Sequence, residues 1–596
     1  MKRMNELIVS RIEKLRQLMK QNGLSAYLIN GSDPHLGEYV PDRWKSREYI
    51  SGFSGSYGWL AITLNHAALW TDSRYYLQAG MQLEGTGIEM LKARLADTPF
   101  IGNWVAERIG QGESVGFDGS CYPASEVRMI EKSFLAKNIR IECQTDLLNN
   151  VWNDRPGIPA KQAFLHAVKW AGKSRKEKIS IISDETQKYG AGMTVISALD
   201  DLCWTFNIRG ADVAYNPVVL GYGIVEDGKA MLFVQPGKFS SGDQEELEAD
   251  GIEIMPYDSF FSYISTLAGH SIVVDPDHTS YLILKILKKS NHLVERISIP
   301  NLLKSRKNAI EIEGMKKAMQ ADGIALLGFQ NWLENALGKE KITEYTIAEK
   351  LTEYRAKVPG YRGDSFHPII GYKDHGAIVH YHVSPEDANE LAPEGVLLFD
   401  SGGQYDFGTT DITRTIMLGE ISEQTKIDFT IVLKGMIALS NIRFPKGTIG
   451  CHLDVLAKRA LWMSYMNYGH GTSHGVGAYL NVHEGPVSIR PDLNNQPVCV
   501  GNVLSNEPAF YREGLYGLRT ENVMVCTPDV TNEYGEFLRF ETLTLYPIDT
   551  RLIEKSLLDQ EEINWINDYH RKVAEELASV IDEGFKPLLE RLTKPI

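Results

Sequence analysis

An acidic hairpin pattern in the C-terminal half of the chain is the feature that most restricts its fold. Residues 396–415 read VLLFDSGGQYDFGTTDITRT: an apolar run ends at Asp400, a glycine-rich turn follows, and a second strand carries Asp411. If the two strands pair symmetrically around the turn, Asp400 lies opposite Asp411 and both carboxylates point to one face. An Asp in DSGG is by itself most often a turn former, so the pattern needs support from other segments.

A second segment repeats this arrangement. Residues 502–525 read NVLSNEPAFYREGLYGLRTENVMV and place Glu507 on one strand and Glu521 on the next, across another turn. Four carboxylates gathered in one partly buried site would raise each other's pKa, and bound divalent cations are the usual way to keep such a cluster ionised. Four oxygen donors and one imidazole suit two ions that share bridging carboxylates. The oxygen-rich set without thiolates favours Mn²⁺, with Co²⁺ or Zn²⁺ as alternatives.

A histidine-rich stretch could supply the imidazole. Residues 470–486 read HGTSHGVGAYLNVHEGP, with histidines at 470, 474 and 483. His470 and His474 have the spacing of the zinc-protease motif H-E-x-x-H, but Gly471 stands in place of the glutamate, and the glycines disfavour a helix. A zinc-protease helix is therefore not expected, and the stretch alone does not decide which histidine is a ligand. By themselves, His380 in GAIVHYHV would be a core histidine and Glu521 a solvated strand residue.

The chain is too long for a single core, since it has 596 residues, and we expect several domains. Two N-terminal blocks, 1–155 and 156–303, share an order of a charged helix followed by short apolar strands, which predicts two related α/β domains. The proline-containing segment 152–159 suits a linker between them. The third block, 304–596, begins with helices, continues with strand and turn signals that include GAIVHYHV, and ends in a charged helical tail over about 553–591. It is expected to be an α+β domain.

An amphipathic helix opens the third block. Its apolar residues recur at helical spacing and are predicted to lie on one face. They are Ile310, Met315, Ala318, Ile324 and Leu327.

Composition narrows the functional classes. The net charge of −15 gives no reason to propose a nucleic-acid or anionic-membrane partner. The six cysteines are scattered without a C-x-x-C pair, which fits a reducing cytosol rather than a disulfide framework. The N-terminus lacks the apolar core of a signal peptide, and no run is apolar enough to cross a bilayer. We therefore expect a soluble, cytoplasmic protein.

The ordered motifs resemble a known family. DSGGQYDFGTTDITRT, HGTSHGVGAYLNVHEGP, NEP and LRTEN, in this order, are similar to the metal-binding segments of the pita-bread metallopeptidases. Within them the chain resembles aminopeptidase P (Xaa-Pro aminopeptidase) in its three-domain form. The likeness extends to YISGFSGS and LWTDSRYYLQAG in the first block and WTFNIRGADVAYNP in the second. It implies two creatinase-type N-terminal α/β domains followed by a pita-bread metallopeptidase domain.

The resemblance also implies roles for individual residues. Asp400 would bind one metal, Asp411 and Glu521 would bridge both, and His474 and Glu507 would bind the other. Glu507 would also move a proton during catalysis.

Four further residues match family positions that line the site. Three histidines would assist substrate binding and proton handling, and one arginine would lie near the metals. They are His380, His470, His483 and Arg519.

The activity implied is removal of the N-terminal residue from peptides with proline at position two, by attack of a metal-bridging hydroxide. The family further implies a homodimer in which the N-terminal domains restrict access. A prolidase, which cuts Xaa-Pro dipeptides, is the nearest alternative, because it has the same metal site. A creatinase-like hydrolase lacks the metals, a methionine aminopeptidase lacks two such preceding domains, and non-enzymatic pita-bread proteins typically lose ligands.

Overall fold

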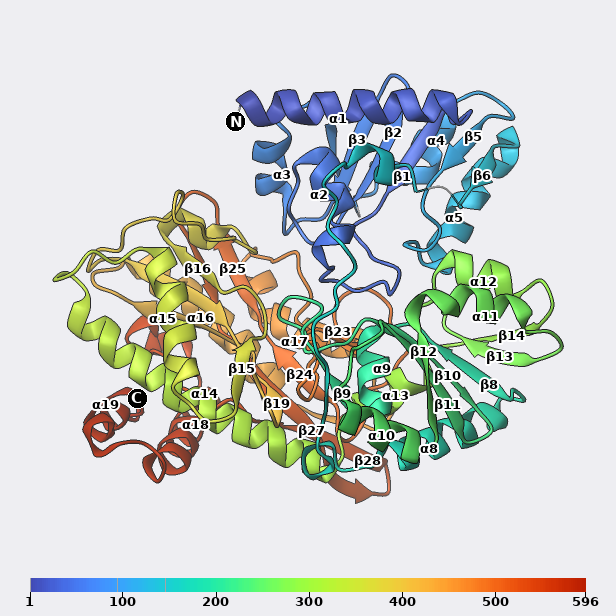
Figure 1. The fold of residues 1–596 in the computed structure, drawn as a ribbon. Coiled ribbons are helices and arrows are strands. Elements are labelled where there is room, and N and C mark those ends of the chain that lie inside the picture. The colour runs from blue at the N-terminus through green and yellow to red at the C-terminus, as the bar shows by residue number, and fades with distance from the viewer. Residues whose placement is uncertain (1, 94, 145) are drawn as a thin grey trace. The chain divides into compact units, whose positions relative to one another are not determined.

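The computed structural model describes residues 2–93, 95–144 and 146–596 and divides the chain into two compact units (Figure 1). The first unit comprises Met1–His166 and Lys173–Asn301, and the second comprises Ala167–Gly172 and Leu302–Ile596. The short helix α7 (Val168–Ala171) therefore belongs with the second unit, although the first unit flanks it in sequence. None of the helices in the described ranges is long and apolar enough to span a membrane.

The first unit contains two six-stranded sheets, and the N-terminal one has the order β4-β3-β2-β1-β5-β6. In this sheet β2 is antiparallel to β1 and β3, whereas β5 is parallel to β1. Helix α1 lies across this sheet because Ile8, Ile12, Leu15 and Met19 recur at helical spacing and are all buried (Figure 1). The strands are β1 (Ala26–Ile29), β2 (Trp59–Thr63), β3 (Ala67–Thr71), β4 (Glu89–Lys92), β5 (Ser114–Gly116) and β6 (Arg140–Glu142). The helices are α1 (Lys2–Gln21), α2 (Ser46–Ser51), α3 (Tyr76–Leu83), α4 (Ile101–Arg108), α5 (Ala124–Phe134) and α6 (Leu148–Val151).

The second sheet repeats the plan of the first. Its order is β12-β11-β10-β8-β13-β14, with β10 antiparallel to β8 and β11, and β13 parallel to β8. The predicted internal repeat is therefore confirmed strand by strand. Its strands are β8 (Met193–Ile196), β10 (Gly221–Glu226), β11 (Lys229–Val234), β12 (Ile252–Pro256), β13 (Ser271–Val274) and β14 (His292–Glu295), and β7 (Phe164–Leu165) pairs separately with β9 (Ile208–Arg209). The helices are α8 (Arg175–Lys188), α9 (Leu199–Phe206), α10 (Ser241–Ala249), α11 (Phe260–Thr266), α12 (Tyr281–Leu287) and, at the end of the block, α13 (Ile299–Ser305).

The second unit is built around α14 (Ala309–Ala336), which Asn308 begins with a capping box to Glu311. Met315, Ala318 and Leu327 are buried as predicted. Ile310 is exposed instead, because it lies in the first turn, beside the cap. The other helices are α15 (Glu344–Ala356), α16 (Glu423–Ser440), α17 (Gly450–Met463), α18 (Gln560–Ala578) and α19 (Lys586–Leu592).

The strands of the second unit form several small sheets around one six-stranded sheet of order β21-β28-β27-β24-β22-β23. The segment GAIVHYHV, included among the expected strand and turn signals, contains no strand: it forms the end of the 3-10 helix η4 (Lys373–Ala377) and a turn. The strands are β15 (Tyr361–Asp364), β16 (Ile369–Tyr372), β17 (Val396–Ser401), β18 (Gly403–Tyr405), β19 (Gly408–Thr409), β20 (Ile412–Met417), β21 (Arg443–Pro445), β22 (Ser473–Gly475), β23 (Glu484–Ile489), β24 (Val503–Asn506), β25 (Ala509–Arg512), β26 (Tyr516–Arg519), β27 (Asn522–Asn532) and β28 (Gly535–Thr542).

Candidate metal centre

The first acidic hairpin is formed by β17 and β20, but its register differs from the expected one. Asp400 pairs with Thr413, and Asp411 lies just before β20. The turn is longer than a symmetric loop because it contains the small hairpin β18–β19. This close turn requires a glycine at position 402, since a Cβ there would come within 2.0 Å of the Thr410 carbonyl oxygen. The offset between Asp411 and Thr413 is two residues, which preserves the face on which a strand side chain lies.

The second acidic hairpin is formed by β24 and β27, with Asn506 opposite Asn522. Glu507 directly follows β24 and Glu521 directly precedes β27, so the two glutamates lie one residue beyond the paired strands, whereas the prediction placed them on the strands. Between them the chain makes a further hairpin, β25–β26, in which Ala509 pairs with Arg519.

His474 lies on β22, beside a register shift between His474 and Gly475. Gly475 allows the strands to approach, because a Cβ there would come within 2.4 Å of the Glu484 carbonyl oxygen. The Nδ1 atom of His474 is 2.8 Å from the Gly475 carbonyl oxygen, which fits a proton on Nδ1 and leaves Nε2 for the cluster.

The two hairpins and β22 bring the candidate ligands together. His474 Nε2 lies 3.3 Å from Asp411 Oδ2 and 3.5 Å from Glu507 Oε1. One donor atom each from Asp411, His474 and Glu521 lie within 4.8 Å of one another. The ring of His483 lies edge-on to that of His474, with centroids 4.3 Å apart.

Asp400 joins the cluster through Arg519. The Nη2 atom of Arg519 donates to Asp400 Oδ2 at 2.7 Å, and its Nε donates to Thr413 Oγ1 at 3.0 Å. Thr413 in turn donates to Glu521 Oε2 at 2.8 Å. Arg519 and Thr413 thus connect the carboxylates of the two hairpins.

A tyrosine extends this network to a second histidine. Arg519 Nη1 donates to the hydroxyl of Tyr511 at 2.5 Å, and that hydroxyl is 2.9 Å from His470 Nε2. His470 therefore lies one tyrosine away from the arginine that holds Asp400.

The acidic groups carry a strong electrostatic signature. Burial, reinforced by Asp411 but opposed by Arg519, raises the pKa of Asp400 to about 6. Burial likewise raises the pKa of Glu507 to about 7, against the favourable charges of His474 and Arg519. The pKa of Glu521 is raised well above its ordinary value by burial and by neighbouring carboxylates, of which Asp411 acts most strongly. Although burial lowers it, the pKa of His474 rises to about 9 through Asp411 and Glu507.

These residues fit divalent cations. Asp400 Oδ1 and Glu521 Oε1 are buried and have no hydrogen-bond partner, which is costly for a carboxylate oxygen unless a cation occupies the space beside it. The donor set of four carboxylates and one imidazole suits hard or borderline divalent ions. Two ions that share carboxylates would stabilise the ionised carboxylates, which burial now disfavours.

His380 lies in the turn that follows η4. This turn is held beside β26, because Gly376 and Gly517 approach so closely that a Cβ on Gly517 would come within 1.7 Å of the Gly376 carbonyl oxygen. A role for His380 at the cluster stays a prediction.

Sequence reasoning missed Tyr511 and Thr413, which join the predicted residues to one another. Tyrosine and threonine are common in β-strands, so nothing in a single sequence distinguishes these two from ordinary sheet residues.

It also missed a buried support beneath the histidine stretch. Lys458 donates to Asp454 at 2.8 Å, Asp454 accepts from Thr472 at 2.6 Å, and Thr472 is hydrogen-bonded to Tyr468. The spacing of Asp454 and Lys458, four apart on α17, was the available signal, but it is also typical of a surface ion pair.

Comparison with known proteins places this centre in a family. Residues 313–528 match metallopeptidase family M24, and residues 536–596 match the C-terminal region of that peptidase family. Residues 11–148 and 154–311 each match the creatinase/prolidase N-terminal domain. A probable Xaa-Pro aminopeptidase P of Paracoccidioides brasiliensis is 38% identical over 98% of this chain and 99% of its own length. The chain belongs to the Xaa-Pro aminopeptidase P branch of metallopeptidase family M24.

Other M24 relatives agree. Xaa-Pro aminopeptidase 1 of Dictyostelium discoideum is 37% identical over 97% of this chain and 94% of its own length. The crystal structure of X-prolyl aminopeptidase from Caenorhabditis elegans, described as a cytosolic enzyme with a dinuclear active site, superposes with a TM-score of 0.94 at 31% identity. The superposition covers 99% of this chain and 100% of the Caenorhabditis elegans chain. The predicted fold, two creatinase-type α/β domains before a pita-bread domain, is thereby confirmed, as is the prediction of a hydrolase of a metallopeptidase family.

Proposed function

We propose that this protein is a metal-dependent aminopeptidase that releases the N-terminal residue from peptides with proline at position two. The observation that carries the proposal is the full-length similarity to Xaa-Pro aminopeptidases, combined with an intact cluster of four carboxylates and one imidazole. A non-enzymatic binding protein would not need to keep buried, unpartnered carboxylate oxygens at the centre of its fold.

We further propose how the two metal ions are held. Asp400 would bind one ion, His474 and Glu507 the other, and Asp411 and Glu521 would bridge them. Mn²⁺ is the proposed ion, because the donor set is rich in oxygen, with Co²⁺ or Zn²⁺ as alternatives. Thr413, which accepts from Arg519 and donates to Glu521 Oε2, fixes the orientation of the Glu521 carboxylate in the cluster.

Bound ions of this kind supply a water nucleophile of lowered pKa and polarise the scissile carbonyl. The residues of the chain supply the proton handling. Glu507 would accept a proton from water and deliver it to the leaving nitrogen, because its carboxylate lies within the cluster, with Oε1 3.5 Å from His474 Nε2. The Tyr511 hydroxyl orients His470 beside it, and Arg519 keeps Asp400 ionised and oriented.

Proline at position two explains why a dedicated site is needed. The Xaa-Pro amide has no N–H, so a peptidase that holds its substrate through that group loses a contact. A site that recognises the ring and the free amine does not depend on it. His380 and His483 are proposed walls of that site, with Arg519 nearby, and the ring contact of His483 with His474 supports its placement.

The chain-level proposals follow the family. We place domain boundaries near residues 155 and 303, and we propose a homodimer without nucleic-acid or membrane partners. A cytoplasmic location is supported by the description of the Caenorhabditis elegans enzyme as cytosolic.

Cleavage by metal-stripped protein, with and without added Mn²⁺, tests the activity. The substrates are Arg-Pro-Pro, the matched Arg-Ala-Pro and the dipeptide Arg-Pro. We expect Mn²⁺-dependent release of arginine from Arg-Pro-Pro and none from Arg-Ala-Pro. Cleavage confined to Arg-Pro would identify a prolidase instead, and no cleavage with Mn²⁺, Co²⁺ or Zn²⁺ would refute the enzymatic proposal.

A further inference from the structure

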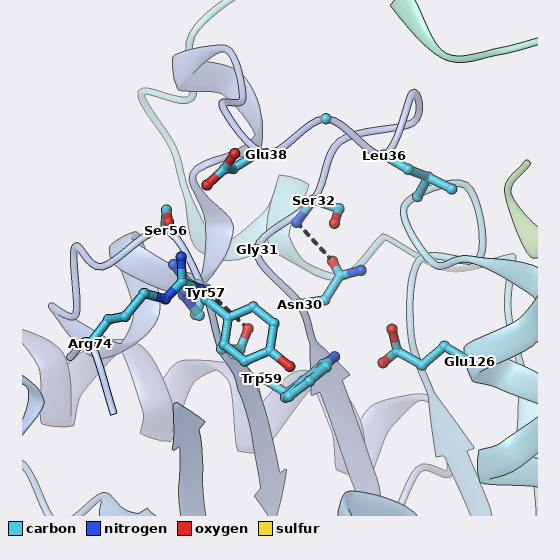
Figure 2. A pocket seen from close by; sticks show the side chains of 13 residues that line it. Asn30, Gly31, Ser32, Leu36, Glu38, Ser56, Tyr57, Trp59, Arg74 and Glu126 are labelled. Carbon is cyan, nitrogen blue, oxygen red and sulfur yellow. Dashed lines mark hydrogen bonds between the residues drawn. The ribbon is translucent and has the colours of Figure 1, made fainter. Parts of the chain in front are cut away.

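The N-terminal domain has a cavity at the ends of the central strands of its sheet, far in sequence from the metal-binding segments. It lies where β1 and β3 end and β2 begins, close to the first turn of α5, and has a volume of about 300 Å³ (Figure 2). Ligands of open α/β sheets bind at the carboxyl ends of the parallel strands, where the strand order diverges. The volume is at the lower limit for sites that take small molecules.

One end of the cavity presents a carboxyl group with unmet bonding capacity. Glu126, in the first turn of α5, points toward the space between Trp59 and Ser32 (Figure 2). Its Oε1 atom is buried and has no hydrogen-bond partner. Burial raises the pKa of Glu126 to about 7, although the Trp59 side chain lowers it by hydrogen bonding. A ligand that donates to this oxygen would remove the cost of leaving it unpaired.

The opposite end carries two arginines together with a second carboxylate, because Glu38 also lines the cavity there. Arg74 lies on the other side of Tyr57 from Glu126 (Figure 2), and Asp72 fixes its guanidinium with contacts of 3.0 Å from Nε and 2.9 Å from Nη2. Arg47, also part of the lining, donates to the Gly58 carbonyl at 2.9 Å. It is buried, its Nε has no hydrogen-bond partner, and among the described residues it forms no ion pair with a carboxylate.

An aromatic wall lies between the two charged ends. The rings of Tyr57 and Trp59 meet edge to face, with centroids 4.9 Å apart and an interplanar angle of 74°. Such a surface suits the apolar body of a ligand, and it keeps the opposite charges of Glu126 and Arg74 apart.

The second N-terminal domain shows that this sheet topology does not by itself leave a cavity at this position. At the corresponding edge of the second sheet, Tyr222 near the start of β10 stacks on Phe260 and lies 4.5 Å from the ring of His35. His35 itself bonds to the Ser197 carbonyl and to the Tyr257 hydroxyl, at 2.9 Å each. Buried side chains fill that edge, whereas the first sheet keeps its cavity.

We propose that the cavity of the N-terminal domain binds a small zwitterion of the amino-acid or short-peptide class. Its ammonium group bonds to Glu126, and its body lies against Tyr57 and Trp59. Its carboxylate faces Arg47, which pairs with no carboxylate among the described residues, whereas Arg74 is already paired with Asp72. A simple anion such as phosphate would meet the carboxylate of Glu126, and a simple cation would meet two guanidinium groups. Only a ligand with both charges complements both ends.

The test follows the indole N–H resonance of Trp59 in the full-length, metal-loaded protein, assigned by its loss in W59F. The probe is Pro-Ala, which has no proline at position two; this choice rests on the proposed function, because Pro-Ala is the peptide product of cleaving Xaa-Pro-Ala. N-acetyl-Pro-Ala lacks the ammonium group and Pro-Ala-amide lacks the carboxylate. Free alanine distinguishes an amino-acid ligand from a peptide, according to which binds more tightly.

We expect Pro-Ala or alanine to shift the Trp59 resonance saturably, and each blocked analogue to need at least about tenfold more ligand, the size of one lost charged hydrogen bond. Glu126→Gln should weaken binding similarly, whereas Glu107→Gln, an exposed glutamate on α4, should bind as the unaltered protein does. The remaining tryptophan resonances report whether E126Q is folded. If it is not, the analogue series in the unaltered protein decides alone.

A Trp59 resonance that does not move up to about 10 mM ligand, a weak limit for any specific site, would overturn the proposal. Equal binding of the N-acetylated analogue, or unchanged binding by folded E126Q, would overturn it as well. These outcomes leave the aminopeptidase proposal standing, because the cleavage assay measures a different event.

Discussion

Arg519 and Asp400 form a buried ion pair, with 2.7 Å between Nη2 and Oδ2, in which the arginine is only 2% exposed. The same guanidinium bonds to Thr413 and Tyr511, so one side chain fixes residues from both acidic hairpins. Its removal would leave Asp400 buried without a counter-charge.

Arg519→Ala should therefore destabilise the metal-free protein by about 3 kcal/mol, the usual effect of breaking a buried pair on one side. Denaturant unfolding of the metal-free protein at neutral pH measures this loss. Arg362→Ala breaks the exposed pair with Asp406 and should change the stability by less than about 1 kcal/mol. Equal losses in the two variants would contradict the importance of burial at Arg519.

Tyr511→Phe removes the hydroxyl that lies between His470 and Arg519. We expect kcat/KM for Arg-Pro-Pro to fall on the order of tenfold, since one positioned hydrogen bond is lost, while metal content stays the same. Tyr516→Phe is the control, because Tyr516 lies on the neighbouring strand of the same hairpin but its hydroxyl donates to Asp428, at 2.9 Å. A loss of bound metal in Y511F would show that Tyr511 supports the ligands rather than the histidine.

Glu507→Gln should change how stability depends on pH in the metal-free protein. The folded-state pKa of Glu507 is raised to about 7, so the folded protein binds this proton more tightly than the unfolded chain does. Stability from this group is complete below the unfolded pKa, near 4.5, and is lost as pH rises through 7. Between pH 4.5 and pH 8, the free energy of unfolding of E507Q should therefore rise relative to that of the unaltered protein by on the order of 3 kcal/mol. Melting temperatures at the two pH values measure this gain, and parallel curves for both proteins would refute it.

Glu521→Gln should reduce the metal content. Its Oε1 atom is buried without a partner, and Thr413 occupies its other oxygen, so an amide in its place would direct either a neutral oxygen or an N–H toward the ions. Elemental analysis after dialysis should give at least one ion fewer per chain than the unaltered protein. Glu513→Gln, an exposed change in the turn between β25 and β26, should keep the full content. Full occupancy in E521Q would remove Glu521 from the ligand set.

Much of the candidate centre follows from local sequence pattern. Both acidic hairpins are visible because apolar runs, glycine-rich turns and acidic residues alternate over short distances. The pairing of Asp400 with Thr413 was not predictable, because a second small hairpin, β18–β19, forms within the turn and changes the register. The 3-10 helix and turn around His380 were not predictable, because the composition of GAIVHYHV is compatible with a strand or a turn, while the Gly376–Gly517 contact, which holds it beside β26, is remote in sequence.

The N-terminal cavity lay beyond sequence reasoning for a similar reason. Glu126 is an ordinary acidic residue in the first turn of a helix, where its charge interacts favourably with the helix dipole. Its unpartnered oxygen becomes apparent only when Trp59 and the loop after β1 are placed around it. The repeat of the two sheets, by contrast, was detectable, because the order of strands and turns is written in both halves.

Helix α7 has a practical consequence for dividing this chain into parts. Its Trp170 ring lies 5.3 Å from that of Phe407, and Asn308 at the start of α14 donates to the Ala171 carbonyl at 3.0 Å. A catalytic fragment that begins at residue 302 would lose this six-residue patch, although the patch is encoded more than a hundred positions upstream, and would expose Phe407. To keep Phe407 covered, a fragment would need residues 167–172, supplied as a separate peptide or joined to residue 302 through a shortened linker. Deleting an internal segment is therefore a better way to isolate this unit than truncating the chain.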